Sequence, residues 1–264
     1  MVTPKHEPWS EDVWRRILTV PSEIRWKRGL RRMVPANPRC KMCNAPFGGP
    51  AGAVFSLFNG GPWPRNPNYC GGCFRTVSDN HGGAEIDCSV LFADVRGSTT
   101  LAEDLTPKAF NRLMGRFHDI AADVLIRHEA IVDKFVGDEI VGLFLPAMAG
   151  PEHPAQAVDS ARELLRETGN WPGRDRLLPI GVGVSSGIAY VGSVGEGSDS
   201  DFTAMGDLVN TTARLASAAA AGEVLVTEAA ASRSGLPVTE LEHRALALKG
   251  KTTPTNVVVV GISG

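Results

Sequence analysis

Two aspartates occupy positions where a carboxylate is costly unless it has a chemical role. Asp94 ends the apolar run SVLFADV, and Asp138 lies at the tip of the predicted hairpin KFVGDEIV. A charged group at the end of a buried strand needs a partner or a metal ion, and the amides of residues 95–99 can hold a phosphate. Together they indicate a two-ion site of the magnesium type, completed by water and substrate phosphates. In the alternative interpretation Asp94 caps a helix and Asp138 is an ordinary turn residue.

Four of the five cysteines form two CxxC pairs, Cys40/Cys43 and Cys70/Cys73, separated by 26 residues. Each CxxC turn directs two thiolates to one point, which predicts a tetrahedral structural zinc site. Iron on the same thiolates and a redox dithiol are the alternatives. A redox CxxC normally begins a helix, whereas both pairs here are expected in Gly/Pro-rich loops. The fifth cysteine, Cys88, is expected in the core.

Length, charge and hydropathy bound the protein class. The 264 residues carry 27 Lys+Arg and 29 Asp+Glu, a net charge of −2, and 43% are hydrophobic. This balance favours a globular protein and argues against a nucleic-acid partner. We recognise no secretory signal and no transmembrane segment, and therefore expect a cytoplasmic protein in a reducing compartment.

Composition divides the chain into three regions. Residues 1–34 form a basic helical arm of net charge +4, expected to pack on its own domain or on a second copy. Because Trp26 lies among basic residues, a membrane-surface or nucleic-acid helix is the alternative. Residues 35–82 form a small zinc-ribbon-like module, since 14 of the 39 residues at 35–73 are Gly or Pro and leave little apolar surface to bury. Residues 84–264 form the main domain.

The main domain alternates strand and helix patterns. Thr106-Pro107 reads as a helix start, and Gly137-Asp138 reads as a hairpin turn. The expected elements are strands at 89–95, 130–136, 139–145, 179–193, 223–227, 240–248 and 256–262, and helices from 107 to 125, at 154–168 and at 207–219. Their order predicts an α+β fold built on a βαββαβ unit with additions.

Four segments in this domain carry a family resemblance: LFADVRGSTTLAE, VDKFVGDEIVGLF, FTAMGDLVNTTARLA and ALKGKTTP. In this order they resemble the class III adenylate/guanylate cyclases, the nucleotidyl cyclases, and the resemblance covers about residues 85–262. It implies a ferredoxin-like catalytic domain that acts as a head-to-tail homodimer with shared active sites.

The resemblance also implies roles for individual residues. Asp94 and Asp138 correspond to the ligands of two Mg²⁺ or Mn²⁺ ions, helped by the Val95 carbonyl. The remaining positions correspond to base-reading Lys134 and Thr203, ribose-orienting Asn210, transition-state-stabilising Arg214 and phosphate-holding Lys249. Thr203 stands where many members have Asp and a bacterial subgroup has Thr. Asn210 and Arg214 are four residues apart and face one side of a predicted helix.

These correspondences predict an adenylate cyclase that converts ATP to 3′,5′-cyclic AMP and pyrophosphate. Lys134 donates a hydrogen bond and the Thr203 hydroxyl accepts one, a pattern that matches adenine N1 and its amino group. Cytosine presents the same pattern, so a pyrimidine (cytidylate or uridylate) cyclase is the alternative enzyme. A catalytically inactive sensor or scaffold is the alternative of another class.

Overall fold

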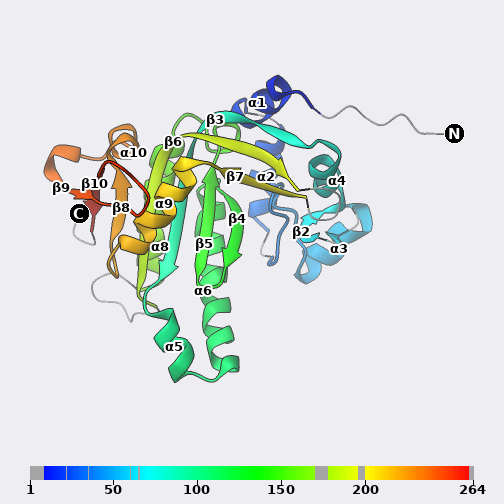
Figure 1. The fold of residues 1–264 in the computed structure, drawn as a ribbon. Helices are drawn as coiled ribbons and strands as arrows, with labels where there is room; N and C mark the ends of the chain where they lie inside the picture. Colours follow the sequence, from blue (N-terminus) through cyan, green and yellow to red (C-terminus); the bar gives the residue numbers. More distant parts are fainter. Residues whose placement is uncertain are drawn as a thin grey trace. The chain divides into compact units, whose positions relative to one another are not determined.

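The computed structural model describes residues 9–21, 23–34, 36–59, 61–64, 66–169, 178–195 and 200–261 (Figure 1). Part of the predicted basic arm, residues 1–8, lies outside the described residues. The chain divides into two compact units, unit 1 with Met1–Ile86 and Tyr190–Met205, and unit 2 with Asp87–Ala189 and Gly206–Gly264. Two of the boundaries fall inside the long strands β3 (Gly82–Val95) and β6 (Ile180–Val194).

One eight-stranded sheet contains most of the strands. Its order is β4-β5-β3-β6-β8-β10-β9, and β7 pairs with β6. The remaining bounds are β4 Ile131–Val136, β5 Glu139–Phe144, β7 Asp201–Met205, β8 Val224–Thr227, β9 Glu242–Leu246 and β10 Thr255–Val260. The pairing of β6 with β8 is parallel, whereas β4 with β5 forms the predicted antiparallel hairpin around Gly137-Asp138.

The predicted βαββαβ order is confirmed as β3, α6 (Pro107–Arg127), β4, β5, α8 (His153–Glu167) and β6. Helix α6 begins where the sequence predicts, because the Thr106 hydroxyl accepts a hydrogen bond from the Ala109 amide. The bounds of the other elements agree within a few residues, except that β3 begins seven residues before the expected strand. The apolar run predicts only the part of β3 that is buried on both faces.

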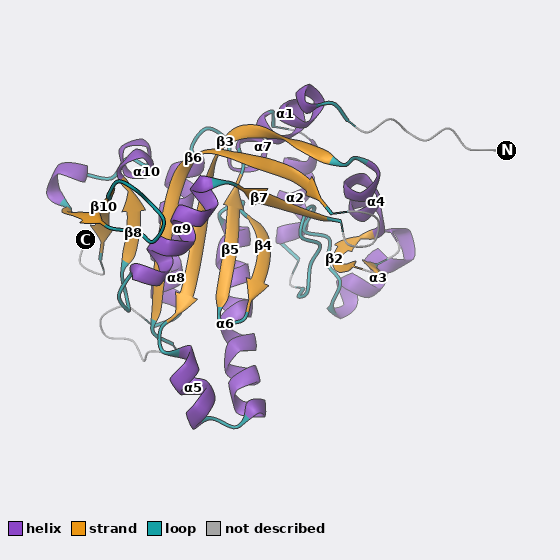
Figure 2. Ribbon diagram, viewed as in Figure 1, coloured by secondary structure: helices purple, strands orange, loops and turns teal. Residues whose placement is uncertain are grey.

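In unit 2, helices cover both faces of the sheet (Figure 2). Helices α6, α8 and α10 (Glu228–Arg233) share one apolar core with Ile180, Val182 and Val184 of β6, and α9 (Asp207–Ala218) lies on the opposite face. Short helices α5 (Ser98–Asp104) and α7 (Pro146–Ala149) and a 3₁₀ turn (Val238–Glu240) complete the unit. None of the described helices combines the length and apolar content that a bilayer crossing requires.

Unit 1 contains the basic arm and the cysteine module. Its elements are α1 (Glu11–Thr19), α2 (Glu23–Arg32), α3 (Gly49–Asn59), β1 (Pro62–Trp63), β2 (Asn66–Cys70) and α4 (Gly71–Asp79), besides β7 and the ends of β3 and β6. The expectation that both CxxC pairs lie in loops is wrong for the second pair, because Cys70 is the N-cap of α4. The Gly-Gly step after Cys70 obscured this helix, which is stabilised by burial of Phe74 and Val77.

The alternating Gly and Val residues of β6 allow α9 to approach the sheet closely. Val182 and Val184 point into the core, whereas Gly181 and Gly183 face α9. A Cβ atom added at Gly183 would lie 2.5 Å from the Thr212 carbonyl oxygen, closer than van der Waals contact permits. The backbone of α9 therefore rests directly on the backbone of β6.

We expect Gly183→Ala to push α9 off the sheet and to lower the free energy of unfolding by about 1–3 kcal/mol. The measurement is the urea midpoint of the full chain. The matched control is Gly115→Ala in α6, where an added Cβ meets no atom within 4 Å and the change should stabilise by up to about 1 kcal/mol. A Gly183→Ala protein as stable as the parent would contradict the close approach.

Candidate functional site

The two aspartates predicted to bind metal lie at adjoining backbone positions. Asp94 occupies the last-but-one position of β3, opposite Glu139 of β5. Asp138 follows Gly137, which has a φ of 63° in the β4–β5 turn. The Val95 amide donates to the Asp138 carbonyl oxygen over 3.2 Å. The fold thus brings the backbones of two aspartates that are 44 residues apart in the sequence next to each other.

Arg96 connects this end of β3 to α9. Its guanidinium forms an ion pair with Asp94 and donates from Nη1 to the Ser217 carbonyl oxygen over 2.6 Å, near the C-terminus of α9. Burial lowers the pKa of Arg96, although the charges of Asp138 and Glu139 oppose this shift. The sequence places Arg96 two residues after Asp94, but it does not predict the hydrogen bond to Ser217. That contact forms only because α9 packs on the sheet.

The carboxylates at this strand end fit a divalent cation. Three carboxylates, those of Asp94, Asp138 and Glu139, lie at this strand end with two cations, Arg96 and Lys134. Burial and the neighbouring Asp138 raise the pKa of Glu139, whose buried Oε1 has no hydrogen-bond partner among the described residues. Carboxylate oxygens are the donors that Mg²⁺ and Mn²⁺ prefer, so the residue types at this strand end fit such an ion.

A cavity of about 500 Å³ opens beside Asp138. Helices α5 and α6 and the β4–β5 turn line it, with Ser98, Thr99 and Asn111 among its polar groups. Ser98 and Thr99 belong to the turn predicted to hold a phosphate. His118 also lines the cavity; its ring lies 4.6 Å from that of Phe135, and burial lowers its pKa. His118 belongs to no motif in the sequence, which therefore did not predict its place in the cavity.

A second cluster combines α9 with the loop between β9 and β10. Asn210 and Arg214 lie one turn apart on α9, and Asn210 is exposed. The Arg214 guanidinium lies against Gly250, where an added Cβ would be 3.4 Å from Nη2. Lys249, which is exposed, directly precedes this glycine. The structure thus brings Lys249 to the helix that carries the predicted catalytic pair.

Apolar packing holds the Lys249 loop in place. Leu248 is buried in a small core with Leu215 of α9 and with Val257 of β10. At the other end of the loop, Lys251 forms an ion pair with Asp207, the first residue of α9. These two anchors position the loop at both ends and leave the Lys249 side chain facing solvent.

Lys134 and Thr203, the predicted base-reading residues, belong to different units. Lys134 lies on β4 opposite Val141, and its side chain is 44% exposed. Thr203 lies on β7 opposite Gly192, and its hydroxyl donates to the Ala204 carbonyl oxygen over 3.4 Å. Their joint contact with one base remains a prediction.

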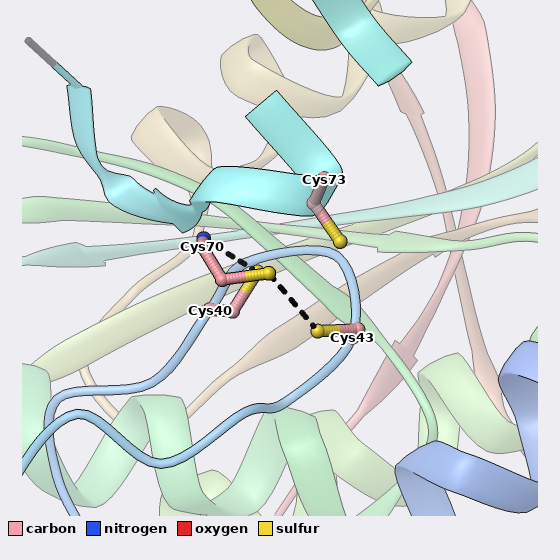
Figure 3. A group of neighbouring side chains, drawn as sticks. All are labelled: Cys40, Cys43, Cys70 and Cys73. Carbon is pink, nitrogen blue, oxygen red and sulfur yellow. Dashed lines mark hydrogen bonds between the residues drawn. The ribbon is translucent and has the colours of Figure 1, made fainter. Parts of the chain in front are cut away.

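The four cysteines of the two CxxC pairs converge in unit 1 (Figure 3). Their sulfur atoms all lie within 4.8 Å of one another, and the Sγ atoms of Cys43 and Cys70 are 3.7 Å apart. Thiolates bound tetrahedrally at about 2.3 Å from one ion would be about 3.8 Å apart. The cluster lowers the pKa of Cys43 to about 7, mainly through Cys40. The donor set therefore fits a four-coordinate metal ion.

Arginines of α2 hold the first CxxC turn. Arg28 is fully buried, and its Nη1 donates to the Met42 carbonyl oxygen over 2.5 Å. Arg31 donates to the Cys43 carbonyl oxygen over 3.2 Å and stacks over Phe55. The arm thus packs on its own chain, as the first interpretation of its basic charge predicts.

Comparisons with known proteins identify the family of the main domain. Residues 84–261 match the family described as the adenylate and guanylate cyclase catalytic domain. Adenylate cyclase 1 of Rhizobium meliloti is 29% identical over 150 residues, which cover 53% of this chain and 23% of that protein. The chain spans about a quarter to a third of the length of the curated relatives it matches.

Two solved structures share the fold of the main domain. The guanylyl cyclase Cya2 has a TM-score of 0.61 and 25% identity, covering 69% of this chain and 96% of that chain. The adenylyl cyclase CyaB from P. aeruginosa has a TM-score of 0.58 and 28% identity, covering 67% and 94%. These relatives differ in the purine base they are named for.

We expect Arg28→Leu to loosen the Cys40–Cys43 turn, because the carbonyl groups of Lys41 and Met42 lose a charged donor inside the protein. The expected loss of stability is about 3 kcal/mol, accompanied by faster release of bound metal to a chelator. Thermal unfolding and a colorimetric metal-release assay measure the two effects. Arg25→Leu, an exposed position on the same helix, is the control. Equal release rates in both variants would contradict a role of Arg28 in holding the turn.

Proposed function

Because the chain belongs to the adenylate and guanylate cyclase catalytic domain family, we propose that it is a nucleotidyl cyclase that converts ATP to 3′,5′-cyclic AMP and pyrophosphate. The observation that carries this proposal is the meeting of Asp94 and Asp138 at the end of β3, linked through the Val95 amide. An inactive scaffold would have no need to keep this costly concentration of negative charge beside an open cavity.

In the proposed reaction the 3′-hydroxyl of the substrate attacks the α-phosphorus. The bond from this phosphorus to the bridging oxygen breaks, pyrophosphate leaves, and the hydroxyl proton passes to water. Two divalent cations held by Asp94, Asp138 and the Val95 carbonyl would activate the hydroxyl and neutralise the leaving group. In this proposal the protein supplies the oxygen ligands of the two cations.

The residues on α9 and its neighbouring loop supply the remaining contacts. Asn210 orients the ribose, and Arg214 stabilises the charge that develops on the α-phosphate. Lys249 binds the terminal phosphates. The Arg214 guanidinium lies beside Gly250, which places the Lys249 loop next to the arginine. This position supports the roles proposed for Arg214 and Lys249.

Base recognition is assigned to Lys134 and Thr203. Adenine offers N1 as an acceptor and its amino group as a donor, which complement an ammonium and a hydroxyl. Guanine presents N1–H and O6, which conflict with both contacts. GTP is nevertheless the second candidate, because one relative of similar fold is a guanylyl cyclase. CTP is the third, since cytosine repeats the adenine pattern.

We further propose that the four-cysteine group holds one structural zinc ion and that the protein works in the reducing cytoplasm. All five cysteines are free, as zinc coordination by thiolates requires. We expect elemental analysis to find about one zinc ion per chain. A brown protein with iron in place of zinc would instead identify an iron centre, and a metal-free protein with full stability would remove the structural role.

We predict that the full chain, assayed with Mn²⁺ and each of the four nucleoside triphosphates, prefers ATP over GTP by about ten- to a hundredfold in kcat/KM. The reason is that a mispaired buried polar group costs about 1–3 kcal/mol. Thr203→Ala should reduce this preference, whereas Thr203→Ser should keep it. Faster turnover of GTP or UTP than of ATP would overturn the base-reading assignment. Absence of any cyclic product would favour the inactive alternative.

The proposed homodimer places the aspartates of one copy and Lys134, Thr203, Asn210 and Arg214 of the other in each of two equivalent sites. Co-expression of Asp94→Ala and Arg214→Ala chains should then restore about a quarter of parental activity. Half of the randomly assembled dimers are mixed, and each mixed dimer has one intact site. The measurement is cyclic AMP formation by the mixture and by each variant alone. An inactive, verified mixed dimer would place the whole site within one chain.

A further inference from the structure

Two residues that adjoin cysteines of the four-cysteine group have side chains that contact β7. Lys41 follows Cys40, and Tyr69 precedes Cys70. The Lys41 Nζ lies 2.9 Å from Asp201 Oδ1, and the Tyr69 hydroxyl donates to the same carboxylate oxygen. Asp201 is the first residue of β7. The Asp201 carboxylate thus accepts hydrogen bonds from two side chains, one from each CxxC segment.

The Tyr69 hydroxyl also accepts a hydrogen bond from the Phe202 amide over 2.9 Å. Among the described strands, β7 pairs only with β6, so its other edge lacks a neighbouring strand there. The tyrosine hydroxyl therefore takes the place of a strand partner at the start of β7. Tyr69 is fully buried and Lys41 is nearly so, whereas the Asp201 side chain is 41% exposed. The buried hydrogen bond from the Phe202 amide to Tyr69 is therefore the contact that burial strengthens most.

The two CxxC segments depend on each other for their positions. The Lys41 amide donates to the Asn68 carbonyl oxygen over 2.8 Å, and the Cys70 amide donates to Cys40 Sγ over 3.3 Å. A metal ion bound by all four thiolates would lock this arrangement. Its loss would remove one of the constraints that hold Lys41 beside Tyr69, besides these hydrogen bonds and the shared contact with Asp201.

We propose that Lys41, Tyr69 and Asp201 are positioning residues for β7, through which the four-cysteine metal centre sets the place of Thr203 and hence the selectivity for the base. Asp201 and Thr203 are two residues apart on one strand, so their side chains lie on the same face. The selectivity part of this inference rests on the proposed cyclase function. The mechanical link between the metal centre and β7 does not.

The experiment compares Tyr69→Phe with Tyr190→Phe in the chain of residues 1–264. Both variants lose one phenolic hydroxyl, but no hydrogen bond involves the Tyr190 hydroxyl within the part of the chain that the structure describes, although Tyr190 lies on the neighbouring strand β6. Metal content by elemental analysis should remain equal in both, because all cysteines are kept. Hydrogen exchange of the Phe202 amide should be about tenfold faster in Tyr69→Phe only.

Kinetics and chelation supply the independent readouts. Tyr69→Phe should raise KM for ATP and lower the ATP-to-GTP preference several-fold, with a smaller change in kcat. Removal of the metal from the parent protein under reducing conditions should speed exchange of the Phe202 amide to a similar degree. In Tyr69→Phe, removal of the metal should add little to the exchange rate of the Phe202 amide, because this amide has already lost the Tyr69 hydroxyl as its acceptor.

The outcomes separate this inference from the proposed function. Unchanged exchange of the Phe202 amide in Tyr69→Phe, or in the metal-free parent, overturns the link between the metal centre and β7. Faster exchange with unchanged base preference in an active enzyme overturns the role in selectivity. A protein that makes no cyclic nucleotide but shows the exchange effects refutes the cyclase proposal and the selectivity role, and retains the link.

Discussion

The direct contact between α9 and β6 is the constraint on which the geometry of unit 2 depends. It exists because β6 alternates valines that fill the core with Gly181 and Gly183, which leave the other face of the strand bare. A helix that rests on backbone has little freedom to shift. Consequently the residues on its outer side, Asn210 and Arg214, have defined positions relative to the sheet. The Gly250 loop then packs on α9 through Leu248.

Electrostatics at the end of β3 follow from the same constraint. The C-terminal part of α9 accepts a hydrogen bond from Arg96, which also pairs with Asp94. One arginine therefore balances only part of the charge from the three carboxylates around it. Carboxylates at such a position are the ligands that hard divalent cations prefer.

Unit 1 depends on polar contacts besides its buried aromatic side chains, among them Trp14, Tyr69 and Phe74. The buried Arg28 donates to carbonyl oxygens of the first CxxC turn, and Tyr69 and Lys41 meet at Asp201. A segment so rich in glycine and proline buries little apolar surface of its own. Hydrogen bonds to charged groups and four convergent thiols supply the order that a larger core provides elsewhere.

The sequence alone predicted most strands and helices of the main domain and the identity of its chemical groups, but it did not predict α5, β7 or α10. Periodicity located α6, α8 and the β4–β5 hairpin, and residue type with spacing identified Asp94, Asp138 and the four cysteines. Only the tertiary structure decided what these groups contact. The N-cap position of Cys70, the burial of Arg28, the bridge made by Arg96 and the meeting of Lys41 with Tyr69 depend on residues far apart in the chain. Local patterns report the propensity of a segment, whereas such contacts depend on how segments pack against one another.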